Sequence, residues 1–277
     1  MTDVPAPGSR AAARAAARRR HSRRSTAIAA ASTVIVVGVL VALIVSAPGW
    51  PAVRETFFSW DAFKTSFPDV LSGFWLDIKL FVICEAVVLV LGLVVALARS
   101  STAPALFPIR AIATLYTDIF RGIPTILLVY LIGFGLPALE LNGVPTDPVV
   151  LGGIAIILSY GGYVAEVYRA GIDSIHPSQK AAGLAVGLTP NQTMRHIVLP
   201  QAVRRVAPPL LNDFISLTKD VALVATLGPL EAFRQAQIAA ASDFNYTPLI
   251  AAALLYLCVT IPLARIVEHM QRKERAR

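Results

Sequence analysis

The chain has 277 residues, 56% of them hydrophobic, with a mean hydropathy of +0.65 and a formal net charge of +8 at pH 7. This composition is too apolar for an ordinary soluble domain and is typical of a protein that crosses a membrane several times. Nucleic-acid binding, the rival explanation for basic segments, is not expected, because no domain of the sequence would support it.

The basic charge gathers at the two ends of the chain. Residues 10–24 contain seven arginines and no acidic residue, and residues 272–277 are mostly basic. Basic ends beside apolar runs favour a cytoplasmic position next to an anionic leaflet, so residues 1–25 are predicted to form a basic cytoplasmic tail. Residues 26–47 are apolar over the length of a span, and we interpret them as an extra, retained N-terminal transmembrane helix. Cleavage of a signal peptide near residue 47 is the alternative.

Aromatic residues crowd the next segment, residues 48–73. Such density suggests an interfacial segment at the outer surface, or a small aromatic cluster that packs on itself. Five further apolar runs are predicted to span the membrane: residues 76–98, 106–139, 148–168, 206–227 and 247–267. With the first helix they give about six transmembrane helices, so the predicted fold class is an all-α polytopic membrane helix bundle.

The run 106–139 is unusually long and is interrupted by Arg121-Gly122-Ile123-Pro124. Glycine and proline there predict a kink that frees backbone carbonyl groups, which a membrane protein tolerates only where protein or a cavity receives them.

Six spans place both termini on the cytoplasmic side. In this arrangement the outer loops carry only three basic residues, Arg54, Lys64 and Arg234. Loops retained in the cytoplasm carry the excess of Lys and Arg. The expected location is therefore the cytoplasmic membrane, as a multi-pass protein with its N and C termini inside.

Residues 166–228 form the longest polar-rich interruption between apolar runs, and their basic bias predicts a cytoplasmic loop. Pro177 suits a first helical position, Gly187 suits the positive φ that ends a helix, and Thr189 with Gln192 predicts a capping box around Pro190. The sequence thus predicts two short helices, residues 179–186 and 190–198, joined by a tight turn. Such a helix–turn–helix suits the docking of a soluble partner, or it is only a structured connector.

The same segment resembles the EAA loop of ATP-binding-cassette (ABC) importer permeases, specifically the polar amino acid subfamily. That family's pattern runs AE-x-x-RGGI, GQ-x-EAA-x-ALG, LPQA-x-R-x-x-P and N-x-x-I-x-L-x-KDTSL. The matching residues are Ala165-Glu166, Arg169-Ala170-Gly171-Ile172, Gln179, Ala182, Gly187-Leu188, Leu199-Pro200-Gln201-Ala202, Arg204, Pro208, Asn212, Ile215, Leu217, Lys219-Asp220 and Ala222-Leu223. Weaker similarity from about residue 67 to the C-terminus places the permease domain at residues 67–270.

The chain departs from the family pattern in the loop. Ala181 stands at the Glu of EAA, Gly183 at its third residue, Ser178 at the Gly of GQ and Val221 at the Thr of KDTSL. The turn glycine is kept, so the docking shape is expected to survive. The resemblance implies an ATPase-coupling loop at about residues 170–200 with these candidate residues: Gln179, Ala181, Ala182, Gly183, Gly187 and Leu188.

Ionisable residues within the predicted spans are candidates for lining a translocation pathway, because each costs about 2.5–3.5 kcal/mol at the bilayer centre unless it faces a cavity or has a partner. We select Glu85, Arg121, Lys219 and Asp220. Lys219-Asp220 matches the family's KD, and adjacent helical residues point about 100° apart, so one can face the pathway while the other bonds a neighbouring helix. The alternative is an ion pair between helices that only holds the bundle together.

The resemblance implies the permease subunit of an ATP-driven importer for a polar amino acid. Its implied partners are two cytoplasmic ABC ATPase subunits, an external solute-binding protein and a second permease chain, identical or similar. The sequence has no GxxxxGK[ST] loop and no HExxH or paired CxxC pattern. We therefore expect no catalysis, metal or cofactor in this chain, with ATP used by the partner subunits. The alternatives are a permease for another small polar solute and a gated channel that works without an ATPase.

Overall fold

The computed structural model describes residues 7–101 and 103–275, which form helices and turns without a strand. The chain divides into two compact units, residues 1–56 and 57–277. In the first unit, α1 (Pro7–Ser46) contains a stretch at Ile28–Ser46 that is long and apolar enough to cross a membrane, and α2 (Trp50–Phe57) follows. Of the predicted basic tail, residues 1–6 lie outside the described residues, and residues 7–25 form the first part of α1.

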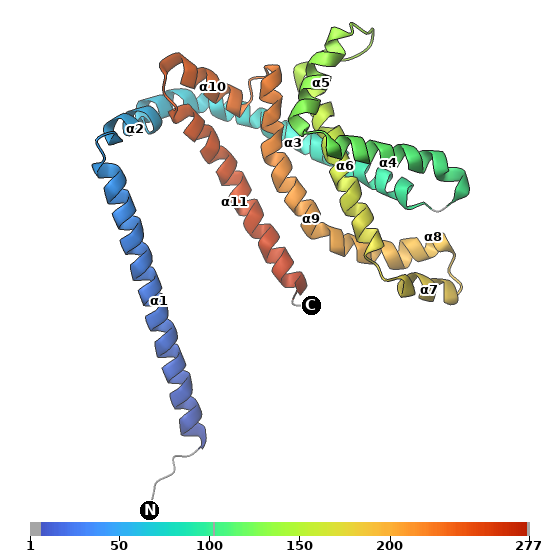
Figure 1. Ribbon diagram of the computed structural model, residues 1–277, viewed down its shortest axis with the longest axis horizontal. Helices are drawn as coiled ribbons and strands as arrows, with labels where there is room; N and C mark the ends of the chain where they lie inside the picture. The colour runs from blue at the N-terminus through green and yellow to red at the C-terminus, as the bar shows by residue number, and fades with distance from the viewer. Residues whose placement is uncertain (1–6, 102, 276–277) are drawn as a thin grey trace, which may run out of the picture. The chain divides into compact units, whose positions relative to one another are not determined.

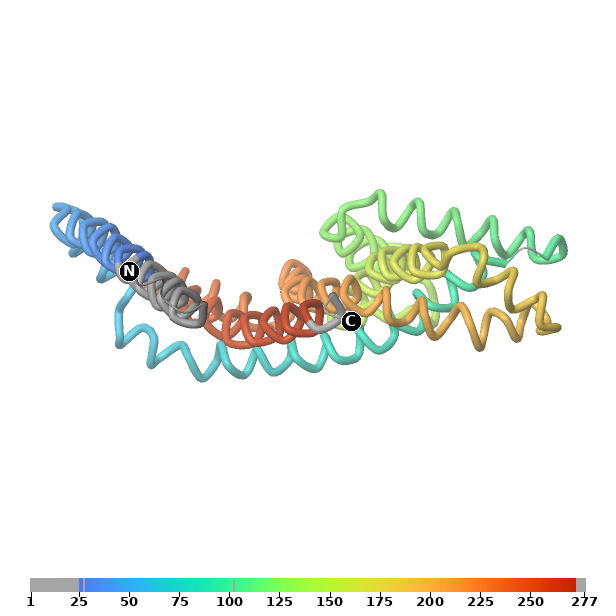
Figure 2. Tube along the Cα trace, turned by 90° about the horizontal axis from the view of Figure 1, so that it is seen from below, coloured from blue at the N-terminus to red at the C-terminus, as the bar shows by residue number. Residues whose placement is uncertain are grey.

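The second unit is a helix bundle (Figure 1). Its elements in chain order are α3 (Trp60–Ser100), η1 (Pro104–Leu106), α4 (Phe107–Gly122), α5 (Thr125–Ala138), α6 (Pro148–Asp173), α7 (Pro177–Ala185), α8 (Pro190–Thr193), η2 (Met194–Val198), α9 (Leu199–Asp220), η3 (Val221–Leu227), α10 (Ala232–Asp243) and α11 (Thr247–Arg275). From the core, α6 and α9 lead to the short helices α7 and α8 at one end of the unit (Figures 1 and 2).

Helix α3 begins well before the predicted span of residues 76–98. The Ser59 side chain caps it by accepting a hydrogen bond from the Ala62 amide, 3.3 Å away. Trp60, Phe63 and Phe67 then stack along one face, with ring centroids 5.4 and 5.1 Å apart, because residues three and four apart are neighbours on a helix. The segment 48–73 is therefore largely helical, and its aromatic rings pack on one another.

The predicted break at Gly122 and Pro124 is confirmed. Helices α4 and α5 meet at an angle of 104°, and the chain turns sharply between them in Figure 2. The hydroxyl of Tyr163 on α6 donates a hydrogen bond to the carbonyl oxygen of Arg121, 3.2 Å away. A neighbouring helix thus receives one backbone carbonyl at the break.

The predicted number of six spans is not reached by length and apolar composition alone. Four helical segments of the described chain meet that test, and the bent pair α4–α5 would be a fifth. Helix α9 does not meet it, because it carries five charged residues: Arg204, Arg205, Asp213, Lys219 and Asp220. The predicted span 206–227 consists of the second half of α9 and the 3-10 helix η3.

The core of the second unit lies where α3, α5, α6, α9 and η3 meet, and α6 packs most extensively against α3. Glycine lets these two backbones approach, since a Cβ on Gly92 of α3 would lie 2.5 Å from Val164 Cγ1 of α6. Small residues serve in this way at many membrane helix crossings. The most deeply buried core side chains are Cys84, Val88, Val129, Ile156, Leu217, Val221 and Val224.

Candidate functional site

The predicted helix–turn–helix is present, with Gly187 at its turn. Gly187 has φ +87°, in the left-handed region that favours glycine. Its amide donates to the Leu184 carbonyl over 3.0 Å, and the Leu188 amide donates to the Gly183 carbonyl over 3.1 Å. These two bonds are the Schellman pattern that ends a helix with a left-handed residue.

The second short helix starts as predicted but continues differently. The Gln192 amide donates to Thr189 Oγ1 (3.3 Å), and the Thr189 amide donates to Gln192 Oε1 (2.8 Å), completing the capping box. After α8 the chain forms a π-helical turn, Met194–Val198, and passes directly into α9. The first helix likewise starts earlier than predicted, at Pro177, after the His176 side chain accepts a hydrogen bond from the Ser178 amide.

Gly183 explains how α7 closes on the following segment. It is buried, and a Cβ placed on it would lie 2.8 Å from both Thr193 Cγ2 and Ile197 Cδ1. Any side chain there would push the helices apart. Gly183, at the third position of the family's EAA, is thus a packing residue between α7 and the segment 193–197.

The opposite side of α7 is exposed. Among the sequence candidates, Gln179, Ala181 and Ala182 are exposed and Leu188 is half-buried. Two apolar side chains that the sequence analysis did not select are also exposed, Leu184 at 50% and Val186 at 76%. They could have been found from the helical spacing of α7, since Gly183 on the buried face puts its neighbours on the other side. The tip of the loop therefore presents an apolar surface with no large side chain at Gly187.

The loop is held firmly to the ends of α6 and α9. Ile172, Ile175, Val198 and Ala202 form a buried apolar cluster beneath it. Arg205 Nη1 on α9 donates to the Ser174 carbonyl at the end of α6, 2.5 Å away. A force on α7 would therefore reach α6 and α9 together.

Arg121 lies in a cluster of arginines around Glu166. Glu166 accepts from Arg99 over 2.8 Å and from Arg169 over 2.5 Å, and Arg121 Nη1 lies 3.6 Å from the same carboxylate. The guanidinium of Arg121 also lies 5.7 Å from the ring centroid of Tyr163. Helices α3, α4 and α6 are thus joined through one carboxylate near the break in the chain.

Lys219 and Asp220 have different surroundings. The hydroxyl of Tyr160 on α6 donates a 2.7 Å hydrogen bond to Asp220 Oδ2, whereas Lys219 is exposed. Among the described residues, neither of the two makes an ion pair. The prediction that one of the pair bonds a neighbouring helix is therefore confirmed for Asp220, and Arg121 is not brought to them.

Glu85 lies on α3 beside the core residue Cys84 and is half-buried. It interacts electrostatically with Asp213 of α9 and Tyr168 of α6. Asp213 was not selected from the sequence, although it lies within a predicted span. The structure thus places carboxylates of α3 and α9 near tyrosines of α6.

A buried pair of carboxyl groups was also missed. Asp77 on α3 and Glu231 before α10 are 2% and 1% exposed. The hydroxyl of Tyr256 on α11 donates to Asp77 Oδ2 over 2.8 Å, and Glu231 accepts from the Phe233 and Arg234 amides over 2.8 and 2.6 Å. Burial raises the pKa of Glu231. Asp77 could have been found, because it stands inside an apolar run.

Known proteins resemble most of this chain. Residues 90–276 match the family model described as binding-protein-dependent transport system inner membrane component. The arginine transport system permease protein ArtQ of Bacillus subtilis (strain 168) is 36% identical over 207 residues, covering 74% of this chain and 92% of ArtQ. The glutamine transport system permease protein GlnP of Escherichia coli (strain K12) is 32% identical over 217 residues, covering 78% of this chain and 97% of GlnP.

Solved structures share the fold. A crystal structure of an amino acid ABC transporter with histidines matches with a TM-score of 0.70 and 29% identity, covering 78% of this chain and 98% of that chain. An inward-facing structure of the MetNI methionine ABC transporter matches with a TM-score of 0.57 and 20% identity, covering 73% and 96%, and shows the fold alone. The matched residues 90–276 include the helix–turn–helix, Arg121, Lys219 and Asp220. The chain belongs to the family of binding-protein-dependent transport system inner membrane components.

Proposed function

We propose that this chain is the permease subunit of an ATP-driven importer in the cytoplasmic membrane, and that its solute is a polar amino acid. The observation that carries the proposal is the α7–Gly187–α8 unit. It presents an exposed apolar surface at Leu184 and Val186 and is fixed to α6 and α9 by the buried cluster beneath it. A soluble ATPase that docks there can move two helices of the bundle at once.

The coupling follows from this attachment. Two ATPase subunits close on ATP, displace α7, and tilt α6 and α9 against α3, which turns the bundle from inward-open to outward-open. A second permease chain, identical or similar, supplies the other half of the pathway, and an external solute-binding protein delivers the solute. ATP binds to the partner subunits, and this chain carries out no catalysis and requires no cofactor of its own.

A polar amino acid suits the charges of the bundle. Its ammonium group is complementary to the carboxylates of Glu85, Asp213 and Asp220, and its carboxylate is complementary to Lys219 and Arg121. The names of the relatives ArtQ and GlnP support an amino acid. We propose Glu85, Arg121, Lys219 and Asp220 as pathway residues on this basis.

The proposed orientation puts α7, α8 and both termini in the cytoplasm. It rests on the arginines of residues 10–24 and on the small number of basic residues in the outer loops. The α7–α8 unit is on the side that an ATPase can reach only in this orientation.

The proposal is tested by reconstituting the permease with its ATPase and solute-binding protein in vesicles. We expect ATP-dependent uptake of one or more of arginine, histidine and glutamine, the solutes that the relatives' names and titles mention. Uptake without the ATPase would instead indicate a channel. ATP-dependent uptake of an unrelated solute, with no amino acid transported, would leave the permease assignment standing and overturn the solute.

A further inference from the structure

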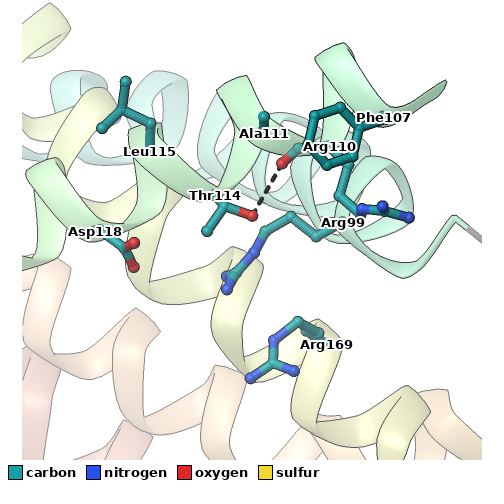
Figure 3. A pocket seen from close by; sticks show the side chains of 8 residues that line it. All are labelled: Arg99, Phe107, Arg110, Ala111, Thr114, Leu115, Asp118 and Arg169. Carbon is teal, nitrogen blue, oxygen red and sulfur yellow. Dashed lines mark hydrogen bonds between the residues drawn. The ribbon is translucent and has the colours of Figure 1, made fainter.

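An open cavity of about 480 Å³ lies between the end of α3, the helix α4 and the end of α6. Figure 3 shows its lining: three arginines, Arg99, Arg110 and Arg169, together with Phe107, Ala111, Thr114, Leu115 and Asp118. The guanidinium groups of Arg99 and Arg169 lie toward one end of the cavity and that of Arg110 toward the other in this view. The arrangement forms a groove with positive charge at both ends.

Two of these arginines keep hydrogen-bond donors for a ligand. Among the described residues, Arg99 donates one bond, from Nη1 to Glu166, and Arg110 donates one, from Nη1 to the Ser101 carbonyl at 2.9 Å. A guanidinium has five N–H donors in a planar fork that matches phosphate oxygens. Arg110 has no carboxylate partner in the described chain, so it is the arginine whose charge is least neutralised.

The groove lies at the end of two candidate membrane spans. The apolar segments of α3 and α6 end at Ser100 and Asp173, next to Arg99 and Arg169. Apolar side chains of α4 stand beside the arginines and are exposed: Phe107 and Leu115 at 60% each and Ile112 at 69%. This is the boundary at which a lipid has its headgroup among polar residues and its acyl chains among apolar ones.

We propose that this groove binds the phosphate of an anionic phospholipid, with Arg110 and Arg99 holding the headgroup and the exposed apolar face of α4 contacting the acyl chains. The leaflet rests on the proposed orientation. The groove is on the side of α7, which follows α6 directly, and that side is the cytoplasmic one. Anionic lipids are concentrated in that leaflet, and basic pockets between transmembrane helices there bind their headgroups.

The test uses the purified complex of permease and ATPase in nanodiscs of phosphatidylcholine with and without phosphatidylglycerol, with bound lipid counted by native mass spectrometry. We expect the wild type to retain phosphatidylglycerol over phosphatidylcholine, and Arg110→Gln to retain it about fivefold less. Arg110→Lys keeps the charge and should lie between the two. Arg265→Gln is the matched control, because Arg265 is 74% exposed and pairs only with Glu268 and the solvent around its own helix.

Several results would overturn the proposal. Equal retention by the wild type and Arg110→Gln, or an equal loss in Arg265→Gln, would show that the groove has no specific role. Displacement of phosphatidylglycerol by millimolar glycerol 3-phosphate would identify a soluble phosphate as the occupant. Loss of ATPase from the Arg110→Gln complex with unchanged lipid would assign the groove to the protein partner. Because no arm measures uptake, failure here is distinct from failure of the proposed function.

Discussion

The hydroxyl of Tyr160 donates a hydrogen bond of 2.7 Å to Asp220 Oδ2, and this contact joins the middle of α6 to the last residue of α9. Hydrogen bonds to a charged group are worth about 1.5–3 kcal/mol. We therefore expect Tyr160→Phe to lower the thermal stability of the purified complex. Asp220→Asn keeps an acceptor for the hydroxyl, so it should be less destabilising but should reduce uptake through its lost charge. Equal stability of Tyr160→Phe and the wild type would show that the bond does not hold the helices.

Lys219 is exposed next to this bond and has no ion-pair partner among the described residues. Lys219→Met should therefore reduce uptake while membrane insertion and thermal stability stay near the wild type. The double variant Lys219→Met/Asp220→Asn is the control. Recovery of uptake in the double variant would reveal an ion pair that only holds the bundle, and wild-type uptake by Lys219→Met would remove it from the pathway.

Gly183 has no room for a side chain between α7 and the segment 193–197. Gly183→Ala, which introduces the family's residue at this position, should cost about 1–3 kcal/mol through overpacking. We expect faster limited proteolysis of the loop and less ATPase in the purified complex. Ala181→Ser is the matched control on the exposed face and should be nearly silent. If Gly183→Ala binds the ATPase as well as Ala181→Ser does, the helices have other ways to separate.

Glu231 makes stability depend on pH. Its pKa is raised by burial above an ordinary value of 4.5, so the folded chain binds its proton more tightly than the unfolded chain does. The stability from this group is complete below the unfolded pKa and is lost as pH rises through the raised one. The melting temperature should therefore fall with rising pH above 4.5, and Glu231→Gln should flatten this slope. Asp243→Asn, at the exposed end of the same helix, is the control, and a Glu231→Gln profile parallel to that of the wild type would contradict the account.

Local signals were enough to predict the helix–turn–helix. The positive φ at Gly187 and the capping box at Thr189 and Gln192 depend on neighbouring residues only, so the sequence contains them in full. The break at Gly122 and Pro124 was predictable for the same reason. Its angle of 104° was not, because packing against α6 sets it.

Tertiary contacts decided what the sequence analysis missed. The early start of α3 was hidden by Asp61, Lys64 and Asp69, which interrupt the hydropathy of a helix that packing nevertheless extends. Tyr256 meets Asp77 across 179 positions of the chain, and no local pattern indicates such a pairing. Likewise, the contrast between Lys219 and Asp220 depends on where Tyr160 lies.

The central claim is that the turn at Gly187 couples this permease to its ATPase, and two glycines provide a direct test. Gly187 and Gly143 have φ +87° and +83°, and a Cβ on either would meet nothing within 4 Å. Aspartate should therefore strain both turns equally, by about 1–2 kcal/mol, but only Gly187 lies in the proposed docking surface. The measurement is ATPase co-purification together with ATP-driven uptake for Gly187→Asp and Gly143→Asp. We predict that both quantities fall together in Gly187→Asp and stay near the wild type in Gly143→Asp. A fully active Gly187→Asp permease, or equal losses in the two variants, would contradict the account.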